Sequence, residues 1–211
     1  MRGPADVLWA TAAALGVELS DEVVAHFDKY LALLNRWSAS VNLVGTRDPD
    51  EIARFHLADC LALLPYVGGA RRVIDVGSGA GLPGAALAIA RPDLEVTSLE
   101  PIHKKHAFLA AVRRELGLTG FTPLAERDEQ HRAAPDFQPY DLAVSRATWA
   151  VPEWLGRGTL LVRPGGRVLG MEGREQHDLP ADAVRHPYQL GDRSRAVVVL
   201  DPAVARGRDP G

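Results

Sequence analysis

A glycine-rich turn follows an acidic residue in the stretch from Val73 to Gly84, V-I-D-V-G-S-G-A-G-L-P-G. Glycine accepts positive φ angles and has no Cβ, so Gly77, Gly79 and Gly81 let the backbone turn tightly and approach a ligand closely. Asp75 stands near the end of an apolar run that is typical of a buried parallel strand. Ligands of open α/β sheets bind at that end of the strands. The stretch therefore predicts a nucleotide-cofactor site with an acid of its own.

The acid before the glycines helps to separate two classes of cofactor. The spacing Gly77-x-Gly79-x-Gly81 differs from the dinucleotide fingerprint G-x-G-x-x-G, although glycine spacing alone leaves a dinucleotide open. Asp75 can accept the ammonium group of S-adenosylmethionine (AdoMet), directly or through water, whereas it would repel a pyrophosphate. D-x-G-x-G-x-G is the usual first motif of AdoMet methyltransferases. A nicotinamide-dependent oxidoreductase is the weaker alternative, because no separate substrate domain or proton-relay set is visible.

A second acid follows the next predicted strand. Residues 94–99 form an apolar and β-branched run that ends at Glu100, 23 residues after Gly77. An acid about 20 residues beyond such glycines can accept hydrogen bonds from ribose hydroxyls. Glu100 is therefore predicted to bind the ribose of the cofactor.

Composition limits the class of protein. A chain of 211 residues with 46% hydrophobic and 24% charged residues suits one globular domain with a helical extension. Its single cysteine, Cys60, excludes an intrachain disulfide and a cysteine-based zinc site, and no metal site is expected. No apolar run is long enough to span a membrane, so we expect a cytoplasmic protein with no membrane partner. The net charge of −3 argues against DNA and requires any anion-binding surface to be local.

Helices are predicted first and alternating strands and helices afterwards. Residues 4–16, 20–37 and 49–64 predict three helices, with Ser20 and Asp48 as N-caps. Along 20–37, apolar residues recur at steps of three and four and form one stripe, which is typical of a helix packed on a core. We therefore expect an N-terminal helical cap over 1–70, an AdoMet-binding methyltransferase domain over 71–202 and a frayed tail over 203–211, in one compact unit. Strands are predicted at 73–77, 94–99, 121–125, 140–145, 167–172 and 196–200, with helices near 83–91, 102–117 and 150–162. This alternation predicts an α/β fold with a doubly wound sheet and right-handed crossovers.

Several further motifs occur along the chain, each of them once. They are Trp37 with Asn42-Leu43, Arg47-Asp48-Pro49, His56 with Asp59, the glycine motif at 75–84, Lys104-Lys105 with Phe108-Leu109, and Ser145-Arg146-Ala147. In this order they resemble the family of bacterial 16S ribosomal RNA guanine-N7 methyltransferase G, also called glucose-inhibited division protein B. The resemblance extends over nearly the whole chain.

The resemblance implies a fold, an activity and a set of site residues. The fold would be the seven-stranded class I AdoMet-dependent methyltransferase fold, which is Rossmann-like, with an N-terminal helical extension. The activity would be methyl transfer from AdoMet to N7 of a guanine in 16S rRNA, with 16S rRNA or the small ribosomal subunit as partner. Cofactor contacts implied by matching positions are Gly77, Leu82, Glu100, the adenine-binding pair Asp128 and Glu129, and Arg146, which could also meet the substrate.

The chemistry expected at N7 needs little from side chains. N7 of neutral guanine carries an exposed lone pair, so no base has to remove a proton, and orientation of the reactants can supply the catalysis. The product ring gains positive charge, which a nearby carboxylate can stabilise. Asp59 is our candidate for that task or for holding His56, and Asn42 could contact a base edge. His56 and Asp59 lie three residues apart on one helix, however, and that spacing equally suits a purely structural hydrogen bond.

Three positions depart from the family pattern by losing or displacing positive charge. Glu172 stands where the family usually has lysine, Phe55 stands where arginine usually precedes the histidine, and Asp201 stands where the family often has lysine. Two alternatives therefore stay open, a divergent relative that methylates another substrate and a catalytically silent AdoMet-binding interaction protein. If rRNA is the substrate, Glu172→Lys is expected to strengthen RNA binding.

Overall fold

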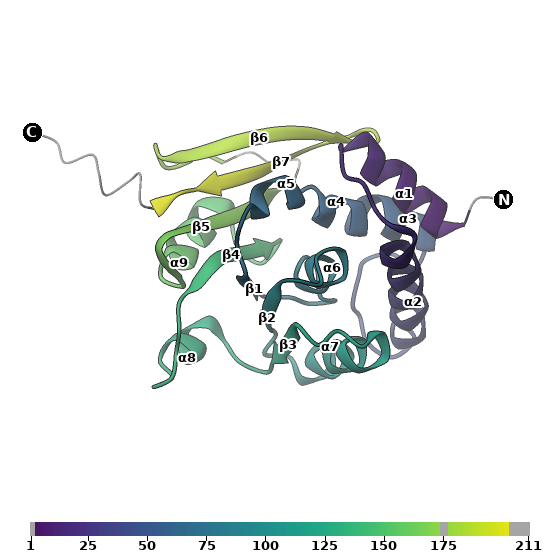
Figure 1. The fold of residues 1–211 in the computed structure, drawn as a ribbon, viewed down its shortest axis with the longest axis horizontal. Coiled ribbons are helices and arrows are strands. Elements are labelled where there is room, and N and C mark those ends of the chain that lie inside the picture. Colours follow the sequence, from purple (N-terminus) through teal and green to yellow (C-terminus); the bar gives the residue numbers. More distant parts are fainter. Residues whose placement is uncertain (1–2, 174–176, 203–211) are drawn as a thin grey trace, which may run out of the picture.

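The structure is a computed structural model that describes residues 3–173 and 177–202. The predicted tail at 203–211 lies outside the described residues. A group of helices comes first in the chain, and a seven-stranded sheet with further helices follows it (Figure 1). The helices before the sheet are α1 (Pro4–Ala14), α2 (Asp21–Trp37), α3 (Pro49–Ile52), the π-helical turn η1 (Ala53–Leu57), α4 (Ala58–Leu61) and α5 (Leu64–Val67).

Helix α2 forms where the apolar periodicity predicted it. The Ser20 hydroxyl caps its first turn by accepting a hydrogen bond from the Val23 N–H at 3.3 Å. Phe27, Tyr30 and Leu34 lie on its buried face. The Tyr30 hydroxyl donates a hydrogen bond to the carbonyl of Ala80, at 2.6 Å. The N-terminal helices are therefore tied directly to the glycine-rich turn.

The third predicted helix is present, but it is not a regular α-helix. Asp48 caps its start through the Asp50 N–H at 3.0 Å, as predicted, and Pro49 occupies the first position. Residues Ala53–Leu57 then form a π-helical turn, after which α4 continues. Such single π turns change which side chains share a face and occur often at functional sites.

The sheet has the strand order β3-β2-β1-β4-β5-β7-β6. The first five strands in this order run parallel, whereas β7 pairs antiparallel with both β5 and β6. The strands are β1 (Arg72–Val76), β2 (Glu95–Leu99), β3 (Phe121–Leu124), β4 (Tyr140–Arg146), β5 (Val162–Glu172), β6 (Ala183–Leu190) and β7 (Arg193–Leu200). The helices among them are α6 (Gly84–Ala90), α7 (His103–Leu116), α8 (Asp128–Arg132) and α9 (Val151–Thr159).

Strand β6 was missed by the sequence prediction, which left its residues in a polar stretch. It lies at the edge of the sheet, where only Leu190 is buried and the other positions are half-buried or exposed, so it contains polar residues and Pro187. Proline lacks the N–H that an inner strand would use in the ladder, but an edge strand tolerates it. With β6, the sheet reaches the seven strands that the resemblance implied.

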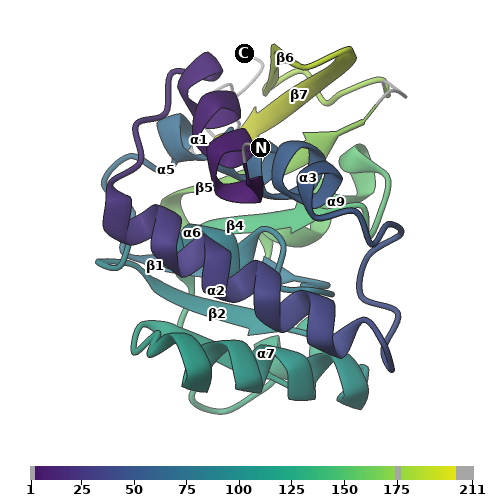
Figure 2. The same cartoon turned by 90° about the vertical axis from the view of Figure 1, so that its right-hand side faces the viewer.

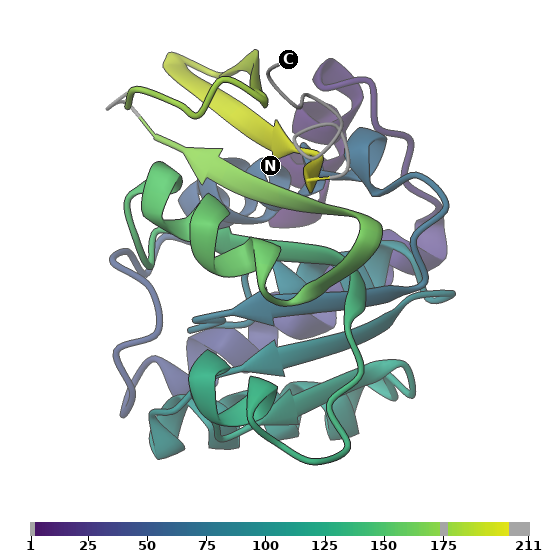
Figure 3. The same cartoon turned by 90° about the vertical axis from the view of Figure 1, so that its left-hand side faces the viewer.

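Helices cover both faces of the sheet. Alternate residues of β1 show this, because Val73 belongs to the core beneath α2, α6 and α7 and Ile74 to the core beneath α9. Figure 2 shows the face covered by α1, α2, α6 and α7, and Figure 3 shows the opposite face. The N-terminal helices share the first of these cores with the sheet. This arrangement leaves the carboxyl ends of the parallel strands free to build a site.

Candidate functional site

The turn after β1 has the glycine conformations that the sequence predicted. Gly77, Gly79 and Gly81 have φ angles of 74°, 58° and 85°, all in the region that favours glycine. A Cβ on Gly77 would stand 2.4 Å from the hydroxyl oxygen of Thr148, whereas a Cβ on Gly79 would meet nothing within 4 Å. Gly77 is therefore needed for close packing, and Gly79 leaves open space beside the backbone.

Asp75 stabilises this turn through hydrogen bonds to residues within it. Its side chain is fully buried, and Oδ2 accepts hydrogen bonds from the Ser78 hydroxyl, the Ser98 hydroxyl and the Gly84 N–H. Burial raises its pKa to about 6, against the lowering effect of these donors. Asp75 is not among the described residues that line the neighbouring cavity. All three donors bond to Oδ2, whereas Oδ1 is buried without a hydrogen-bond partner among the described residues, and the predicted contact of Asp75 with the cofactor stays a prediction.

Glu100 follows β2 and connects the turn to the next loop. Its Oε2 accepts a hydrogen bond from the Gly79 N–H at 2.8 Å, and its Oε1 accepts one from the Ile102 N–H at 2.9 Å. The side chain is buried but lines the cavity over the turn. Each carboxylate oxygen has a second lone pair, so Glu100 can still accept hydrogen bonds from a ligand.

We call the hollow over this turn the glycine-loop cavity. It has a volume of about 480 Å³ and is lined by residues 77–80, Leu82, residues 100–102, Lys105, Leu43, Val44 and residues 146–148. The open space at Gly79, the acid at Glu100 and the apolar side chains of Leu82 and Ile102 suit a nucleoside ligand. These residues therefore fit AdoMet, with backbone for close approach and a carboxylate for ribose hydroxyls.

A second hollow, the arginine cavity, adjoins the first. It has a volume of about 420 Å³ and shares Arg146 and Ala147 with the glycine-loop cavity. Its other lining residues are Phe55, His56, Asp59, Trp149, Val151, Met171, Glu172, Gly173, His177, Arg193 and Arg195. Ala147 has a φ of 56°, which is unusual for a residue with a Cβ and typical of functional sites. The two cavities thus meet at a strained position that follows β4.

The side chain of Arg146 lies at this junction and joins two of the predicted site residues. Its guanidinium donates to Asp59 Oδ2 at 3.3 Å and to His56 Nδ1 at 3.4 Å. Asp59 Oδ1 accepts a further hydrogen bond from the Tyr188 hydroxyl at 2.6 Å. His56 and Asp59 are therefore linked through Arg146, and the sequence missed Tyr188 because it belongs to the unpredicted strand β6.

His56 is uncharged at neutral pH. Burial and the nearby Arg146 guanidinium lower its pKa to about 4, although Asp59 acts in the opposite direction. An Nδ1 that accepts from Arg146 also requires a neutral ring with its proton on Nε2. His56 can therefore offer a neutral N–H to a ligand in the arginine cavity.

Four other predicted site residues are not in the lining of either cavity. One of them is Gly81, which belongs to the turn after β1. Asn42 is exposed, next to Leu43 and Val44, which do line the glycine-loop cavity. Asp128 and Glu129 begin α8 and form ion pairs with Arg157 of α9. The structure does not bring these two carboxylates into the lining of either cavity.

The departures at Glu172 and Phe55 have a structural explanation. Glu172 is 3% exposed and forms an ion pair with Arg185, whose Nε lies 2.6 Å from Oε2. Its charge is therefore compensated, and the prediction that Glu172→Lys strengthens RNA binding remains untested, although the substitution would place lysine beside Arg185 in a buried position. At the other position, the Arg193 guanidinium carbon lies 3.6 Å from the centre of the Phe55 ring. Positive charge is thus present at Phe55, supplied from β7.

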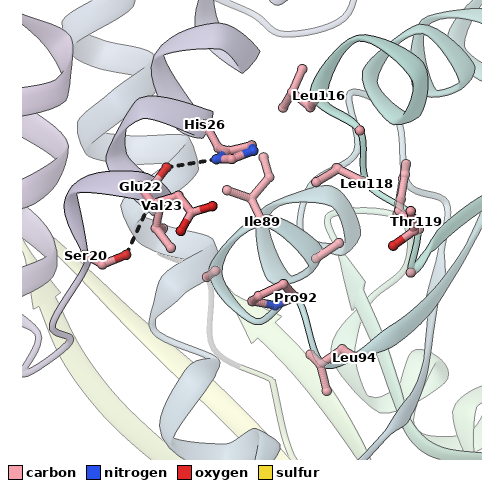
Figure 4. Close-up of a pocket in the computed structure, with 15 residues that line it drawn as sticks. Ser20, Glu22, Val23, His26, Ile89, Pro92, Leu94, Leu116, Leu118 and Thr119 are labelled. Carbon is pink, nitrogen blue, oxygen red and sulfur yellow. Dashed lines mark hydrogen bonds between the residues drawn. The ribbon is translucent and has the colours of Figure 1, made fainter.

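A third cavity, of about 430 Å³, lies away from this site (Figure 4). It is enclosed by the start of α2, the end of α6 and the end of α7, at the amino ends of β2 and β3. His26 Nδ1 lies 2.8 Å from the Glu22 carbonyl on one of its walls. None of the predicted site residues lines it.

Two further observations concern the described part of the chain, residues 3–173 and 177–202. In that part of the chain, no group of three or more histidine, cysteine, aspartate or glutamate residues could hold a metal ion. No described helix combines the length and apolar character needed to cross a membrane.

Comparisons with known proteins agree with this geometry. A family model described as rRNA small subunit methyltransferase G matches residues 23–200. The chain is 41% identical to ribosomal RNA small subunit methyltransferase G of Aromatoleum aromaticum, over 76% of this chain and 77% of that protein. It is 37% identical to the protein of the same name from Myxococcus xanthus, over 91% of this chain and 95% of the relative.

Solved structures support the fold alone. An O-methyltransferase from Bacillus cereus, in complex with SAH, superposes with a TM-score of 0.60 at 15% identity, over 82% of this chain and 90% of that one. The O-methyltransferase TomG from Streptomyces achromogenes, in complex with SAM, gives 0.57 at 17% identity, over 86% and 90%. The predicted doubly wound, seven-stranded fold is confirmed.

Proposed function

The chain belongs to the rRNA small subunit methyltransferase G family, and from this membership we propose that it transfers the methyl group of AdoMet to N7 of a guanine in small-subunit ribosomal RNA. Membership confirms the predicted enzyme class, an AdoMet-dependent methyltransferase. The observation that carries the proposal is the meeting of two cavities at Arg146 and Ala147. The glycine-loop cavity would hold the methyl donor, and the arginine cavity would hold the acceptor base.

On the donor side, Gly77, Gly79 and Leu82 would hold the cofactor against the backbone, and Glu100 would accept hydrogen bonds from its ribose. When bound, AdoMet supplies a methyl group attached to a positively charged sulfur. Gly81 would act by shaping the turn, since a Cβ there would stand 2.8 Å from the Ala85 Cβ.

Three further residues belong to the donor side in the proposal, although none of them lines the glycine-loop cavity. Asp75 would hold the turn through its hydrogen bonds and would place a buried negative charge next to it. Asp128 and Glu129 would contact the adenine from the start of α8, where Arg157 pairs with both carboxylates.

On the acceptor side, the residues would orient the base and not remove a proton from it. The lone pair of N7 can attack without a general base, and neutral His56 is consistent with that. Correct orientation of donor and acceptor is worth up to roughly 7–11 kcal/mol. Asp59 would stabilise the positive charge that develops on the ring, and Arg146 would hold Asp59 in place. Asn42 would contact the RNA from the exposed loop beside Leu43.

The charges of the arginine cavity support an RNA substrate. Arg146, Arg193 and Arg195 line it, whereas its two carboxylates, Asp59 and Glu172, are engaged by cations. The local balance is therefore positive although the chain carries a net charge of −3. Because its substrate would be part of the ribosome, we place the enzyme in the cytoplasm.

The direct test is transfer of labelled methyl from AdoMet to small ribosomal subunits from a strain that lacks this protein, followed by mapping of N7-methylguanine. We expect label at a single guanine of the rRNA. Arg146→Met should lower the rate at least hundredfold, about 2.7 kcal/mol, because it removes the group shared by both cavities. Arg36→Met is a matched control, since Arg36 pairs with Glu115 outside both cavities.

Two outcomes would contradict the proposal. Absence of label, with AdoMet binding confirmed by calorimetry, would indicate a divergent enzyme with another substrate. Absence of both transfer and AdoMet binding would indicate a protein that has lost the activity of its family.

A further inference from the structure

Phe55 and Arg193 form a stacked pair in the lining of the arginine cavity. Phe55 belongs to η1 and Arg193 begins β7, so the fold brings them together from distant parts of the chain. The guanidinium carbon of Arg193 lies 3.6 Å from the ring centre, which places the cation directly over the face of the ring. Both residues line the cavity.

Neighbouring groups hold this pair in position. The Arg193 Nη2 donates to Glu51 Oε1 at 3.3 Å, and the other oxygen of Glu51 accepts a hydrogen bond from the Thr46 hydroxyl at 2.7 Å. A Cβ on Gly191 would stand 3.4 Å from the Phe55 ring, so the turn between β6 and β7 packs against that ring. The Arg193 side chain nevertheless remains 41% exposed. It therefore presents a fixed but accessible planar group.

The proposed substrate has a matching flat group to offer. N7 of a guanine in a paired RNA helix lies in a deep, narrow groove that side chains do not enter. A guanine that enters the arginine cavity must therefore be unpaired or extruded, which leaves the bases beside it without their stacking partners. Unstacked RNA bases bind on aromatic rings and on the planes of arginine guanidinium groups.

We propose that Phe55 and Arg193 form a stacking platform for an unpaired base next to the target guanine. This inference rests on the proposed function and specifies its substrate as RNA with an unpaired neighbouring nucleotide. The alternative is that Arg193 binds a phosphate through its charge. Glu51 carries an opposite charge 3.3 Å from the guanidinium, which weakens a purely electrostatic role and leaves the planar face unaffected.

Arg193→Lys tests the platform, because lysine keeps the charge and removes the plane. We expect KM for methylation of small subunits to rise about tenfold, equivalent to about 1.4 kcal/mol, with kcat within twofold of the wild-type value. The salt dependence of RNA binding should keep its slope. Arg36→Lys, at an exposed arginine paired with Glu115 away from the cavity, should leave KM unchanged.

Phe55→Leu should raise KM by a similar factor, and the double variant should lose little more, because both changes remove the same stack. Thermal melting of each variant separates a loss of fold from a loss of binding. Wild-type KM in Arg193→Lys together with a smaller salt slope in Arg193→Gln would identify a phosphate contact and overturn the proposal. Independent, additive effects of the two single variants would also overturn it.

A binding experiment distinguishes failure of the platform from failure of the proposed methylation. Fluorescence anisotropy would compare a single-stranded RNA oligonucleotide containing guanine with the same oligonucleotide lacking the base next to it. We expect the wild-type protein to bind the abasic oligonucleotide about tenfold more weakly and Arg193→Lys to bind both alike. Equal binding of both oligonucleotides by the wild type would reject the platform, whether or not rRNA is methylated.

Discussion

On one side of Arg146, the glycine-loop cavity is lined largely by two short stretches of chain, 77–82 and 100–105, whereas on the other side the arginine cavity is lined by residues from several distant elements. The first uses positive-φ glycines and the loop from Glu100 to Ile102. The second combines residues of η1, α4, β4, β5 and β7. A short stretch of sequence can therefore determine much of the first cavity, but only the assembled fold determines the second.

The buried carboxylates near the two cavities also differ in their hydrogen-bond partners and in their pKa values. Asp75 accepts hydrogen bonds from two hydroxyls and one amide on Oδ2 alone, and burial raises its pKa to about 6. Glu172 is also buried, which alone would raise its pKa, but the Arg185 guanidinium and the His177 N–H outweigh burial and lower it. Removing a charge should therefore be tolerated on the donor side, and reversing a charge should be severe on the acceptor side.

Glu172→Lys should have the largest effect. The variant buries an ammonium group beside Arg185 and removes the acceptor of the His177 N–H. Breaking a buried ion pair in this way costs about 3–5 kcal/mol, a large part of the stability of a typical domain. Urea unfolding followed by circular dichroism measures the loss.

Glu95→Lys on β2 is a suitable control for that change, because Glu95 is exposed and the charge change is the same. It should alter the free energy of unfolding by no more than about 0.5 kcal/mol. A Glu172→Lys variant that is as stable as the wild type and binds RNA more tightly would confirm the original expectation for this position. Charge reversal would then be tolerated on the acceptor side, against the contrast drawn between the two cavities.

Prediction from sequence succeeded where the determinants are local. The apolar run before Asp75, the glycines after it and the spacing to Glu100 identified β1, the turn and β2. The stripe on α2 and its Ser20 cap were equally readable, because capping and periodicity depend on neighbours in sequence. The family motif added His56 and Asp59, although not the reason why they are close to Arg146.

Prediction failed where contacts join distant segments. Arg146 and Asp59 are separated by 87 residues, and Tyr188 and Asp59 by 129. The π turn at Ala53–Leu57 also leaves no sign in the apolar pattern. Glu172 was interpreted as a lost RNA contact because its partner Arg185 belongs to an edge strand that the sequence did not reveal.

Asp75→Asn tests the donor side and should have the next largest effect. The raised pKa means that the folded protein disfavours the ionised carboxylate, so this group lowers stability as pH rises from about 4 to about 6. Asparagine keeps an oxygen acceptor and removes the charge. Between pH 4.5 and pH 8, the variant should gain about 2 kcal/mol relative to the wild type.

Urea unfolding of both proteins at the two pH values measures this gain, and titrations common to both cancel in the difference. Ser98→Ala, which removes one donor and keeps the carboxylate, should retain the wild-type direction of the pH dependence. A constant difference between Asp75→Asn and the wild type across this range would show that Asp75 has an ordinary pKa. The contrast between a raised pKa at Asp75 and a lowered pKa at Glu172 would then be wrong.

Tyr188→Phe should have the smallest effect and sharpens the comparison most. Its hydroxyl donates to Asp59 Oδ1, yet Tyr188 is not among the described residues that line either cavity. Asp59 would keep its contact with Arg146, and the Arg195 Nε, 3.9 Å from Oδ1, could move closer, so we expect a cost of about 1 kcal/mol. AdoMet affinity by calorimetry should change by less than twofold, because Tyr188 acts on the lining of the glycine-loop cavity only through Asp59 and Arg146.

Methyl transfer to small subunits should fall up to about tenfold in kcat/KM, since a less constrained Asp59 holds Arg146 less firmly. Tyr66→Phe is the matched control. Tyr66 of α5 packs against His186, which lies on β6 as Tyr188 does, and no contact joins Tyr66 to Asp59 among the described residues. Equal losses in both variants would assign the effect to general packing of β6. A loss of AdoMet affinity in Tyr188→Phe would show that the two cavities are coupled more tightly than their separate construction implies.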